Sequence, residues 1–318
     1  MQGFFKKPYR YALIYSCVLI LFTVYVLLDT FVIPHRQEKA KDPHSVTDVC
    51  STDNSMCISS AAARTDSSKA ETAGNNYTVT DSSYKDDNIS IDISEINKYD
   101  THIYIADIRL SSADLLKTAF AENTFGRNIK AKTSEIAQES NAVFAVNGDY
   151  CGFRDYGYVI RNSNVYRNKA GDGDALIISK DGTMSAVSEK DSDAEELVQN
   201  GVVQALSFGP VLVTDSMTAV SENEEVARAK NSNPRTAVGM IEPLHYIFIV
   251  ADGRTSESKG LSLYELAGIM ADKRCTFAYN LDGGGSSAMW FNGQIINHPT
   301  DGRSEGERSV SDIVYIGY

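Results

Sequence analysis

Residues 245–285 read HYIFIVADGRTSESKGLSLYELAGIMADKRCTFAYNLDGGG, and this stretch decides the fold class of the C-terminal region. Residues 245–251 form a continuous apolar run, rich in β-branched side chains, that is typical of a buried strand, and residues 276–281 form a second one. Between them, a capping box and apolar residues at helical spacing predict a helix over 262–273. Strand, helix and strand in this length indicate a βαβ unit with two parallel strands.

Two carboxylates stand at the ends of these strands. Asp252 follows the first strand and Asp282 follows the second. Parallel strands end at the same edge of a sheet, where open α/β sheets build their ligand sites. If the strands are neighbours, the carboxylates should lie within about 5–10 Å of each other. Two close carboxylates do not ionise independently, so one pKa rises and that group becomes a proton donor.

The glycine run after Asp282 indicates a binding site rather than a turn. A turn needs one glycine, whereas Gly283, Gly284 and Gly285 are followed by Ser286, and three glycines let backbone N–H groups approach an anion. Asp-Gly at 181–182 is interpreted as a hairpin turn. Asp-Gly at 172–173 favours a turn too, with cation binding by the acidic pair at 172 and 174 as the alternative.

Several cations and histidines are candidates whose sequence context leaves two interpretations open. Arg235 stands directly before a strand and could clamp a phosphate, although an ordinary surface arginine is the simpler interpretation. Arg254 has the same two interpretations. Glu265 is expected to cap the helix, and His245 to lie in the core or at a sheet edge. His298 lies in a polar loop, where either a surface position or a place near a site would fit.

The N-terminal region predicts a membrane anchor. Residues 11–28 carry no charge, and the apolar run resumes after Asp29 and stops at Pro34, which is long enough to span about 30 Å of hydrocarbon. The basic residues of the short N-terminal tail favour a cytoplasmic N-terminus. We expect a cytoplasmic tail over 1–10, an uncleaved signal anchor over 11–33 and an extracytoplasmic C-terminal domain. A buried helix of a soluble protein is the alternative.

Residues 34–90 are predicted to be a disordered stalk. They are rich in Ser, Thr and Asp and nearly free of large aliphatic side chains, so they cannot bury enough apolar area to offset the entropy of ordering. Cys50 and Cys57 could form a small disulfide loop there, while Cys151 and Cys275 could be paired or free, because spacing alone does not decide connectivity.

The remaining residues, 91–318, are expected to form one α/β or α+β head domain with a mixed β-sheet. After residues 111–112 the spacing of apolar residues at 115, 116, 119 and 120 predicts a short helix, and a second helix should begin near Thr133 and end near Ser140. A hairpin is predicted over 175–187. Further strands are predicted over 102–110, 142–146, 202–206, 211–213 and 237–240.

The charge balance excludes one broad class of partner. The chain has 30 Lys and Arg residues against 42 Asp and Glu residues, giving a formal net charge of -12. A nucleic-acid binder would need clustered cations facing phosphates, so we expect no nucleic-acid partner. Hydrophobic residues make up 42% of the chain, enough for a sizeable core. The mean hydropathy of -0.24 is too low for a protein with many membrane spans.

Six segments between residues 147 and 286, taken in chain order, resemble the phosphodiester glycosidase family, which includes bacterial exopolysaccharide-associated proteins. The resemblance covers about residues 100–318, and its most specific block is Asn280-Leu281-Asp282-Gly283-Gly284-Gly285-Ser286. Glu307-Arg308-Ser309-Val310 also resembles the closing segment of the family. The other five segments are Asn147-Gly148-Asp149, residues 207–213, Pro234-Arg235-Thr236-Ala237-Val238-Gly239, Asp252-Gly253-Arg254 and residues 261–267.

The resemblance implies hydrolysis of a sugar-1-phosphodiester in a cell-surface or exported glycan, releasing the sugar and leaving a phosphomonoester. Asp282 or Asp252 would act as base or nucleophile, and no cofactor or metal is implied. Residues 149–153 depart from the family pattern, so Asp149 could add a third carboxylate. A non-catalytic polysaccharide-binding module and a Ca²⁺-stabilised structural head are the alternatives. The implied substrate-binding residues are Asn147, Gly148, Asp149, Arg235, Thr236, Gly253, Arg254, Asn280, Gly283, Gly284, Gly285, Ser286 and Arg308.

Overall fold

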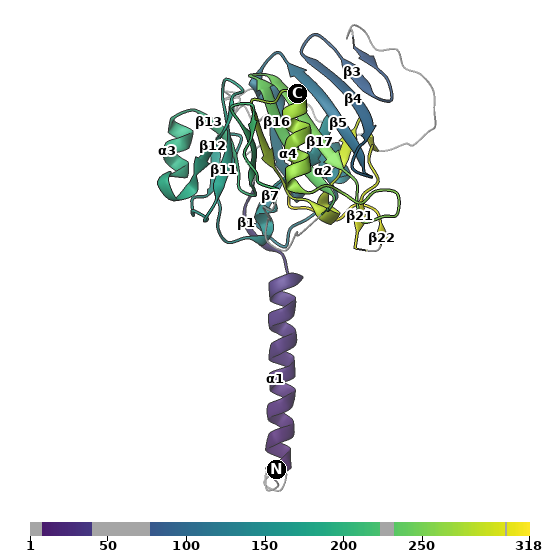
Figure 1. The fold of residues 1–318 in the computed structure, drawn as a ribbon. Coiled ribbons are helices and arrows are strands. Elements are labelled where there is room, and N and C mark those ends of the chain that lie inside the picture. The colour runs from purple at the N-terminus through teal and green to yellow at the C-terminus, as the bar shows by residue number, and fades with distance from the viewer. Residues whose placement is uncertain (1–7, 40–76, 223–231, 303) are drawn as a thin grey trace, which may run out of the picture.

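A computed structural model of the chain describes residues 8–39, 77–222, 232–302 and 304–318. Its first element is the helix α1 (Pro8–Phe31), which projects alone from a sheet-rich head (Figure 1). Residues 10–31 of this helix have a mean hydropathy of 2.3, and none of that stretch is buried in the protein. Among the described residues it is the one helix long and apolar enough to cross a membrane, at the place where the sequence predicts the anchor.

The predicted stalk is corrected at its first residues. The strand β1 (His35–Lys39) pairs antiparallel with β7 (Thr124–Arg127) of the head. The side-chain amide of Asn128 donates hydrogen bonds to the carbonyls of Thr30 and Ile33, over 3.0 and 3.1 Å. The chain therefore enters the head directly after the helix, because backbone pairing satisfies polar groups that a stalk would leave to water.

The predicted stalk is corrected at its last residues too. Residues 77–90 contain β2 (Thr78–Val79), β3 (Ser83–Lys85) and the start of β4 (Ile89–Asn97), which form one edge of the largest sheet. The rest of the stalk prediction falls on residues 40–76, with Cys50 and Cys57, and lies outside the described residues.

The largest sheet has nine strands, and every ladder in it is antiparallel. The strands β17 and β18 run in the same direction, because each pairs antiparallel with β16, which lies between them. The predicted order of strand, helix and strand is correct, but the two strands are not neighbours, because β16 and β17 form a hairpin whose other edge takes β18. The sheet order is β15 (Met217–Thr218), β14 (Val211–Thr214), β18 (Phe277–Asn280), β16 (Arg235–Glu242), β17 (His245–Ala251), β5 (His102–Leu110), β4, β3 and β2.

Two five-stranded sheets and two ribbons, β1–β7 and β21 (Thr300–Asp301) with β22 (Ser304–Glu305), complete the described head. One sheet has the order β20 (Gln294–Ile295), β19 (Met289–Phe291), β8 (Phe144–Asn147), β23 (Asp312–Ile316) and β6 (Leu116–Phe120). The other has the order β10 (Asn164–Arg167), β9 (Val159–Arg161), β13 (Val202–Leu206), β11 (Asp174–Ser179) and β12 (Met184–Ser188).

The prediction of a helix after residues 111–112 is wrong. Only a 3-10 turn, Ala113–Leu115, forms there, and the chain continues as the strand β6. Leu116, Thr118 and Phe120 are buried while the residues between them are half-buried, which is the two-residue period of a strand. The apolar spacing fitted both periods, and pairing with β23 decided between them.

Three α-helices cover the sheets. The helix α4 (Leu263–Asp272) has the predicted capping box and packs its apolar face on the largest sheet. The helix α2 (Thr133–Glu139) covers the sheet that contains β8, and α3 (Ala194–Gln199) covers the sheet that contains β11. The main core lies between the largest sheet and the two smaller ones. Cys151 and Cys275 are buried in separate cores and are not disulfide-bonded.

Candidate active site

Three arginines converge on the three glycines that follow Asp282. A Cβ added to Gly284 would lie 2.8 Å from the guanidinium of Arg254, and one added to Gly285 would lie 2.7 Å from that of Arg308. A Cβ on Gly283 would lie 2.9 Å from the carbonyl of Pro234 and 3.9 Å from the side chain of Arg235. The sequence therefore uses glycine here because any side chain would displace a guanidinium or the backbone that carries one.

The amide groups of this run are largely occupied. The Gly283 N–H donates to the Asp282 carboxylate over 2.9 Å, and the Gly284 N–H donates to the Pro234 carbonyl over 2.8 Å. The glycine amides, which the sequence predicted to bind an anion, are therefore mostly not free to do so. The guanidinium groups that pack against the glycines can take that role instead. Guanidinium groups present several N–H donors in a planar fork that matches phosphate oxygens.

Arg235 is the buried member of the three arginines. Its side chain is 4% exposed, and its Nε donates to the Leu261 carbonyl over 3.0 Å. Burial, followed by repulsion from Arg254, lowers the pKa of Arg235 to about 10. Because cations lower each other's pKa only when they lie close, an anion bound between them would be strongly stabilised.

The other two arginines are more accessible and are held by single acceptors. Arg254 is exposed, has a left-handed backbone with φ of 66°, and donates to the Asn233 side chain over 3.3 Å. Arg308 pairs with the carboxylate of Asp301 in β21 over 2.6 Å. Each guanidinium has further N–H groups that can turn to a ligand.

Asp282 directly precedes these glycines in the chain. Its side chain is partly exposed, and burial raises its pKa, while the Ser286 hydroxyl, the Gly283 amide and the positive charges of Arg308 and Arg154 oppose that rise. An aspartate with a raised pKa beside several arginines is a typical catalytic carboxylate.

Several residues predicted to line the pocket instead position the backbone under Asp282. The Asn147 side chain donates to the Asp282 carbonyl over 2.7 Å and accepts from the Thr236 hydroxyl over 2.7 Å. The Asn280 side chain donates to the Gly209 carbonyl over 2.7 Å. All three polar side chains are fully buried, so the structure places them beneath the site rather than on its surface.

Asp252 is held in a separate hydrogen-bonding group. Its side chain is 5% exposed and accepts from the Asn297 amide over 2.9 Å and from the His298 backbone over 3.0 Å. The His298 ring lies 3.4 Å from this carboxylate and 3.0 Å from the Tyr104 hydroxyl, and it is 82% exposed. Burial raises the pKa of Asp252. Its neighbour Gly253 has no space for a side chain because Pro234 packs against it.

The two carboxylates are farther apart in the sheet than adjacent strands would place them. Because β16 separates β17 from β18, the backbones of Asp252 and Asp282 lie roughly 10 Å apart, twice the strand spacing. The Asn297 amide connects the two groups, since it also donates to the Ser287 carbonyl over 3.2 Å, next to the Ser286 that bonds to Asp282.

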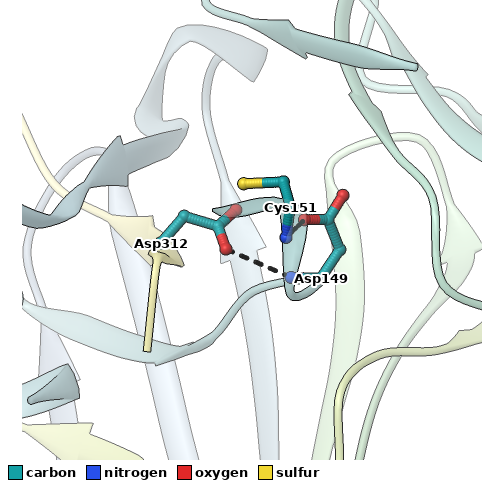
Figure 2. Close-up of side chains that lie close together, drawn as sticks. All are labelled: Asp149, Cys151 and Asp312. Atoms are coloured by element: carbon teal, nitrogen blue, oxygen red, sulfur yellow. Dashed lines mark hydrogen bonds between the residues drawn. The ribbon is translucent and has the colours of Figure 1, made fainter. Parts of the chain in front are cut away.

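Asp149 lies beside Cys151 and Asp312 (Figure 2), and it pairs with Arg161 in an enclosed ion cluster rather than with the arginines around the glycines. The guanidinium of Arg161 lies 3.1 Å from Asp149 and 2.8 Å from Asp312, and the three side chains are no more than 2% exposed. The second Asp149 oxygen accepts from the Ser207 N–H over 2.8 Å. Gly148 lies directly over the Asp312 carboxylate, where a Cβ would clash with it.

This cluster contains a geometric candidate for a metal. In the part of the chain that the structure describes, Asp149, Cys151 and Asp312 form a group of potential metal ligands. The carboxylate oxygens and the sulfur atom that could bind a metal lie within 4.8 Å of one another. Arg161 already neutralises part of its charge, and burial and Asp149 raise the pKa of Asp312 to about 6. Burial also raises the pKa of the Cys151 thiol. A buried arginine that already pairs with both Asp149 and Asp312 suits an ion-paired scaffold better than a metal site.

Sequence reasoning missed Arg161 and Asp312 entirely, because they are 151 residues apart and belong to no motif. It also missed Arg154, whose charge lowers the pKa of Asp282. For His298, the polar loop around it is the one sequence feature that suggests a place near a site. A cavity of about 230 Å³ beside Leu116 and Gln204 and one of about 620 Å³ beside Met184 and Phe277 contain none of the predicted site residues.

Comparison with known proteins gives a consistent result. The family model described as phosphodiester glycosidase matches residues 140–317, more than half of the chain. A prophage-derived uncharacterised protein of Bacillus subtilis is 30% identical over 61% of this chain and 31% of its own length. The bovine and human N-acetylglucosamine-1-phosphodiester alpha-N-acetylglucosaminidases are 29% and 28% identical over 59% of this chain and 39% and 40% of their own. The chain thus spans between about a third and two fifths of the length of these relatives.

Solved structures show the same fold. The zebrafish N-acetylglucosamine-1-phosphodiester alpha-N-acetylglucosaminidase catalytic domain, auto-inhibited by its pro-peptide, superposes with a TM-score of 0.57 at 22% identity. The match covers 72% of this chain and 83% of that one. A hypothetical protein from Synechocystis also gives a TM-score of 0.57, at 13% identity over 73% of this chain and 62% of that one.

Proposed function

Because this chain belongs to the phosphodiester glycosidase family, we propose that it hydrolyses a glycosyl-1-phosphodiester, releasing the free sugar and a phosphomonoester. The observation that carries the proposal is the convergence of Arg235, Arg254 and Arg308 on the glycine run beside Asp282. Three cations around a glycine run that follows a partly exposed carboxylate suit a substrate that is itself an anion and reacts next to its charge.

The arginines are proposed to bind the phosphate and to stabilise it as the leaving group. When the bond between the anomeric carbon and the phosphate oxygen breaks, its electron pair goes to that oxygen and the phosphate gains charge. Guanidinium groups fixed before the reaction stabilise that charge without reorganisation, which is the usual source of large rate effects. Arg235 suits this role best, because its burial excludes competing water.

Asp282 is proposed to act at the anomeric carbon. It either removes a proton from the attacking water or attacks the carbon itself, and these routes give opposite anomers of the sugar. Detecting the first-formed anomer by NMR distinguishes them. Neither route needs a strong general acid, since a phosphomonoester is a moderate leaving group.

Asp252 is proposed to position rather than to react. Its carboxylate is almost completely enclosed, and it interacts with the loop at Asn297 and His298 and with Tyr104. It therefore orients the exposed His298 ring, which can contact a substrate hydroxyl. Asn147 and Thr236 are also proposed to have a supporting role, because they hold the backbone beneath Asp282. Asn280 supports the neighbouring backbone through the Gly209 carbonyl.

The location is proposed from α1. A single span with the basic tail inside would anchor the protein in a membrane with the head outside, facing exported or surface glycans. Protease treatment of intact cells tests this orientation: the head should be digested, and protection of the head would contradict it.

The test of the reaction is an isotope experiment. The purified full-length protein, in detergent, is given a sugar-1-phosphodiester with an aryl aglycone, which stays on the phosphate, in water enriched in oxygen-18, and the products are analysed by mass spectrometry. We expect the label in the released sugar, because the bond to carbon is the one that breaks. Label in the phosphate would identify a phosphodiesterase instead, and binding without turnover would identify a binding module. Adding a chelator should change neither rate nor melting temperature, whereas a loss of melting temperature would favour a Ca²⁺-stabilised head.

A further inference from the structure

A short path of backbone contacts joins the end of α1 to the loop beside Asp282. In β7, Gly126 lies against the carbonyl of His35 in β1, where a Cβ would clash. On its other side, Gly152 packs so that a Cβ there would lie 3.1 Å from the Gly126 carbonyl. Gly152 belongs to the 3-10 turn η4 (Cys151–Phe153), which leads directly into Arg154.

Aromatic side chains in and around this turn form a platform with Arg154, whose charge acts on Asp282. The rings of Tyr150 and Phe153 stack with centroids 4.6 Å apart, and the guanidinium of Arg154 lies 4.7 Å from the ring centroid of Phe208. Arg154 also lowers the pKa of Asp282 through its charge. The platform, defined as Tyr150, Phe153, Arg154 and Phe208, is therefore part of the same site.

The contacts limit how far the site can lie from the helix. One strand spacing separates His35 from Gly126, one backbone contact separates Gly126 from Gly152, and two residues lead to Arg154, giving roughly 15–20 Å. Figure 1 shows β21 and β22 at the end of the head from which α1 emerges. The strand β21 packs on the turn Gly284–Ser286 and carries the Asp301 that holds Arg308.

The connection between helix and head has no flexible spacer. Pro34 is followed at once by the β1–β7 ladder, and the Asn128 amide binds two carbonyls at the end of the helix. Arg36 and Glu122 add an ion pair of 3.1 Å. An inserted helix would therefore hold the site within roughly 15–20 Å of the end of the membrane span.

We propose that the substrate is a glycosyl phosphodiester whose aglycone is anchored in the same bilayer as α1. This rests on the proposed function and adds the location of the aglycone. A lipid-linked anion in the membrane plane meets the arginines at a high local concentration, whereas a distant soluble polymer gains nothing from a site held at the surface. The aromatic platform supplies an apolar surface for the aglycone.

The experiment lifts the head by a known amount. The full-length protein is reconstituted in phosphatidylcholine vesicles, and a twenty-residue (EAAAK)₄ spacer, about 30 Å long where helical, is inserted between Pro34 and His35. Two probes are used: a sugar-1-phosphodiester with a dialkylglycerol aglycone in the vesicles, and the same compound with a short water-soluble aglycone. We expect the spacer to lower turnover of the anchored probe at least tenfold and to leave turnover of the soluble probe unchanged.

The matched control carries the same spacer between residues 57 and 58. It lengthens the chain after β1, so it should affect neither probe, because β1 already fixes the head to the helix. Equal loss from both insertions would support a stalk and overturn the proposal, as would unchanged turnover of the anchored probe after the first insertion. Absence of turnover with either probe in the unmodified protein would instead refute the proposed function.

Discussion

Two charge clusters lie on either side of the segment 147–149, and they are built in opposite ways. In the enclosed cluster, Asp149 and Asp312 surround the single cation of Arg161, and almost none of it is exposed. In the open cluster, three arginines surround the run of glycines beside Asp282, which is partly exposed. The first has an excess of carboxylates, and the second an excess of guanidinium groups.

This difference indicates a structural role for the enclosed cluster and a binding role for the open cluster. In the enclosed cluster both carboxylates pair with Arg161 inside the protein, and Asp312 packs against Gly148, whose carbonyl accepts from the Asp282 N–H over 3.2 Å. The open cluster keeps repelling cations together, which costs stability unless an anion binds. Unfavourable repulsion between like charges at an exposed position is typical of a binding site. Pairing of opposite charges inside the protein is typical of a structural scaffold.

The strongest test of the open cluster is Asp282→Asn. Because the amide can neither attack carbon nor accept a proton from water, kcat should fall by at least about 10⁴-fold, in the range seen when a nucleophile or its base is removed. Circular dichroism and melting temperature should be unchanged. Asp181→Asn, in the exposed hairpin turn, is the matched control and should keep full activity; comparable losses in both variants would remove Asp282 from the mechanism.

The enclosed cluster should respond through stability. Arg161→Met leaves two buried carboxylates without their cation, so we expect the free energy of unfolding to fall by about 3–5 kcal/mol. The fluorescence of the single tryptophan, Trp290, which is buried in the sheet that carries Asp312, reports unfolding by urea. A loss below about 1 kcal/mol would show that the cluster is not a scaffold.

Removing a cation from the open cluster should affect catalysis instead. For Arg235→Met we expect kcat/KM to fall by about 10²–10³-fold, as when one fixed donor to a developing anion is lost. The exposed Arg109→Met is the control with the same loss of charge. If the two variants have equal activity, general attraction rather than a fixed contact explains phosphate binding.

A smaller effect is expected for Gly285→Ala. The new methyl group would displace the Arg308 guanidinium, so kcat/KM should fall by roughly tenfold, a loss in the range of a single weakened hydrogen bond to a charged group. Gly173→Ala adds the same methyl group where no atom lies within 4 Å, and it should leave the rate unchanged. Activity of Gly285→Ala at the level of that control would show that Arg308 does not contact the substrate.

The pH profile should show the mildest effect. Burial raises the pKa of Asp282, and its reacting form is the carboxylate, so activity should decline on acidification at a pH above the ordinary aspartate value of about 3.9.

For Asp312 the raised pKa affects the stability of the fold, and this effect weakens as the pH rises. Its contribution to stability is present below the unfolded pKa and is lost as pH rises through about 6, so Asp312→Asn should flatten stability in that range.

The sequence predicted local features well. The strands at 102–110, 202–206 and 245–251 and the capped helix near 262–273 follow from burial patterns and caps that need no distant partner. The segment 116–120 was assigned to a helix because its apolar spacing satisfied both periods, and only the distant strand β23 selects the strand.

The candidate site shows the same limit. Motifs predicted that Asp282, the glycines and three arginines belong together, yet the reason for the glycines emerged only from the guanidinium groups packed against them. Asp149 is adjacent to the motif in sequence, but Arg161 and Asp312 draw its carboxylate into the enclosed cluster. Contacts between residues this far apart leave no trace in spacing or composition.

The position of β23 has a consequence for how the head folds. This strand, residues 312–316, inserts between β8 and β6 and brings Asp312 under Gly148. On a ribosome, β6 and β8 emerge well over a hundred residues before the strand that joins them. Because such non-local pairing is slow and leaves edges exposed, the sheet stays open to aggregation and proteases throughout that delay. The enclosed cluster thus closes late, and the backbone of the candidate site becomes fixed only after its own synthesis is complete.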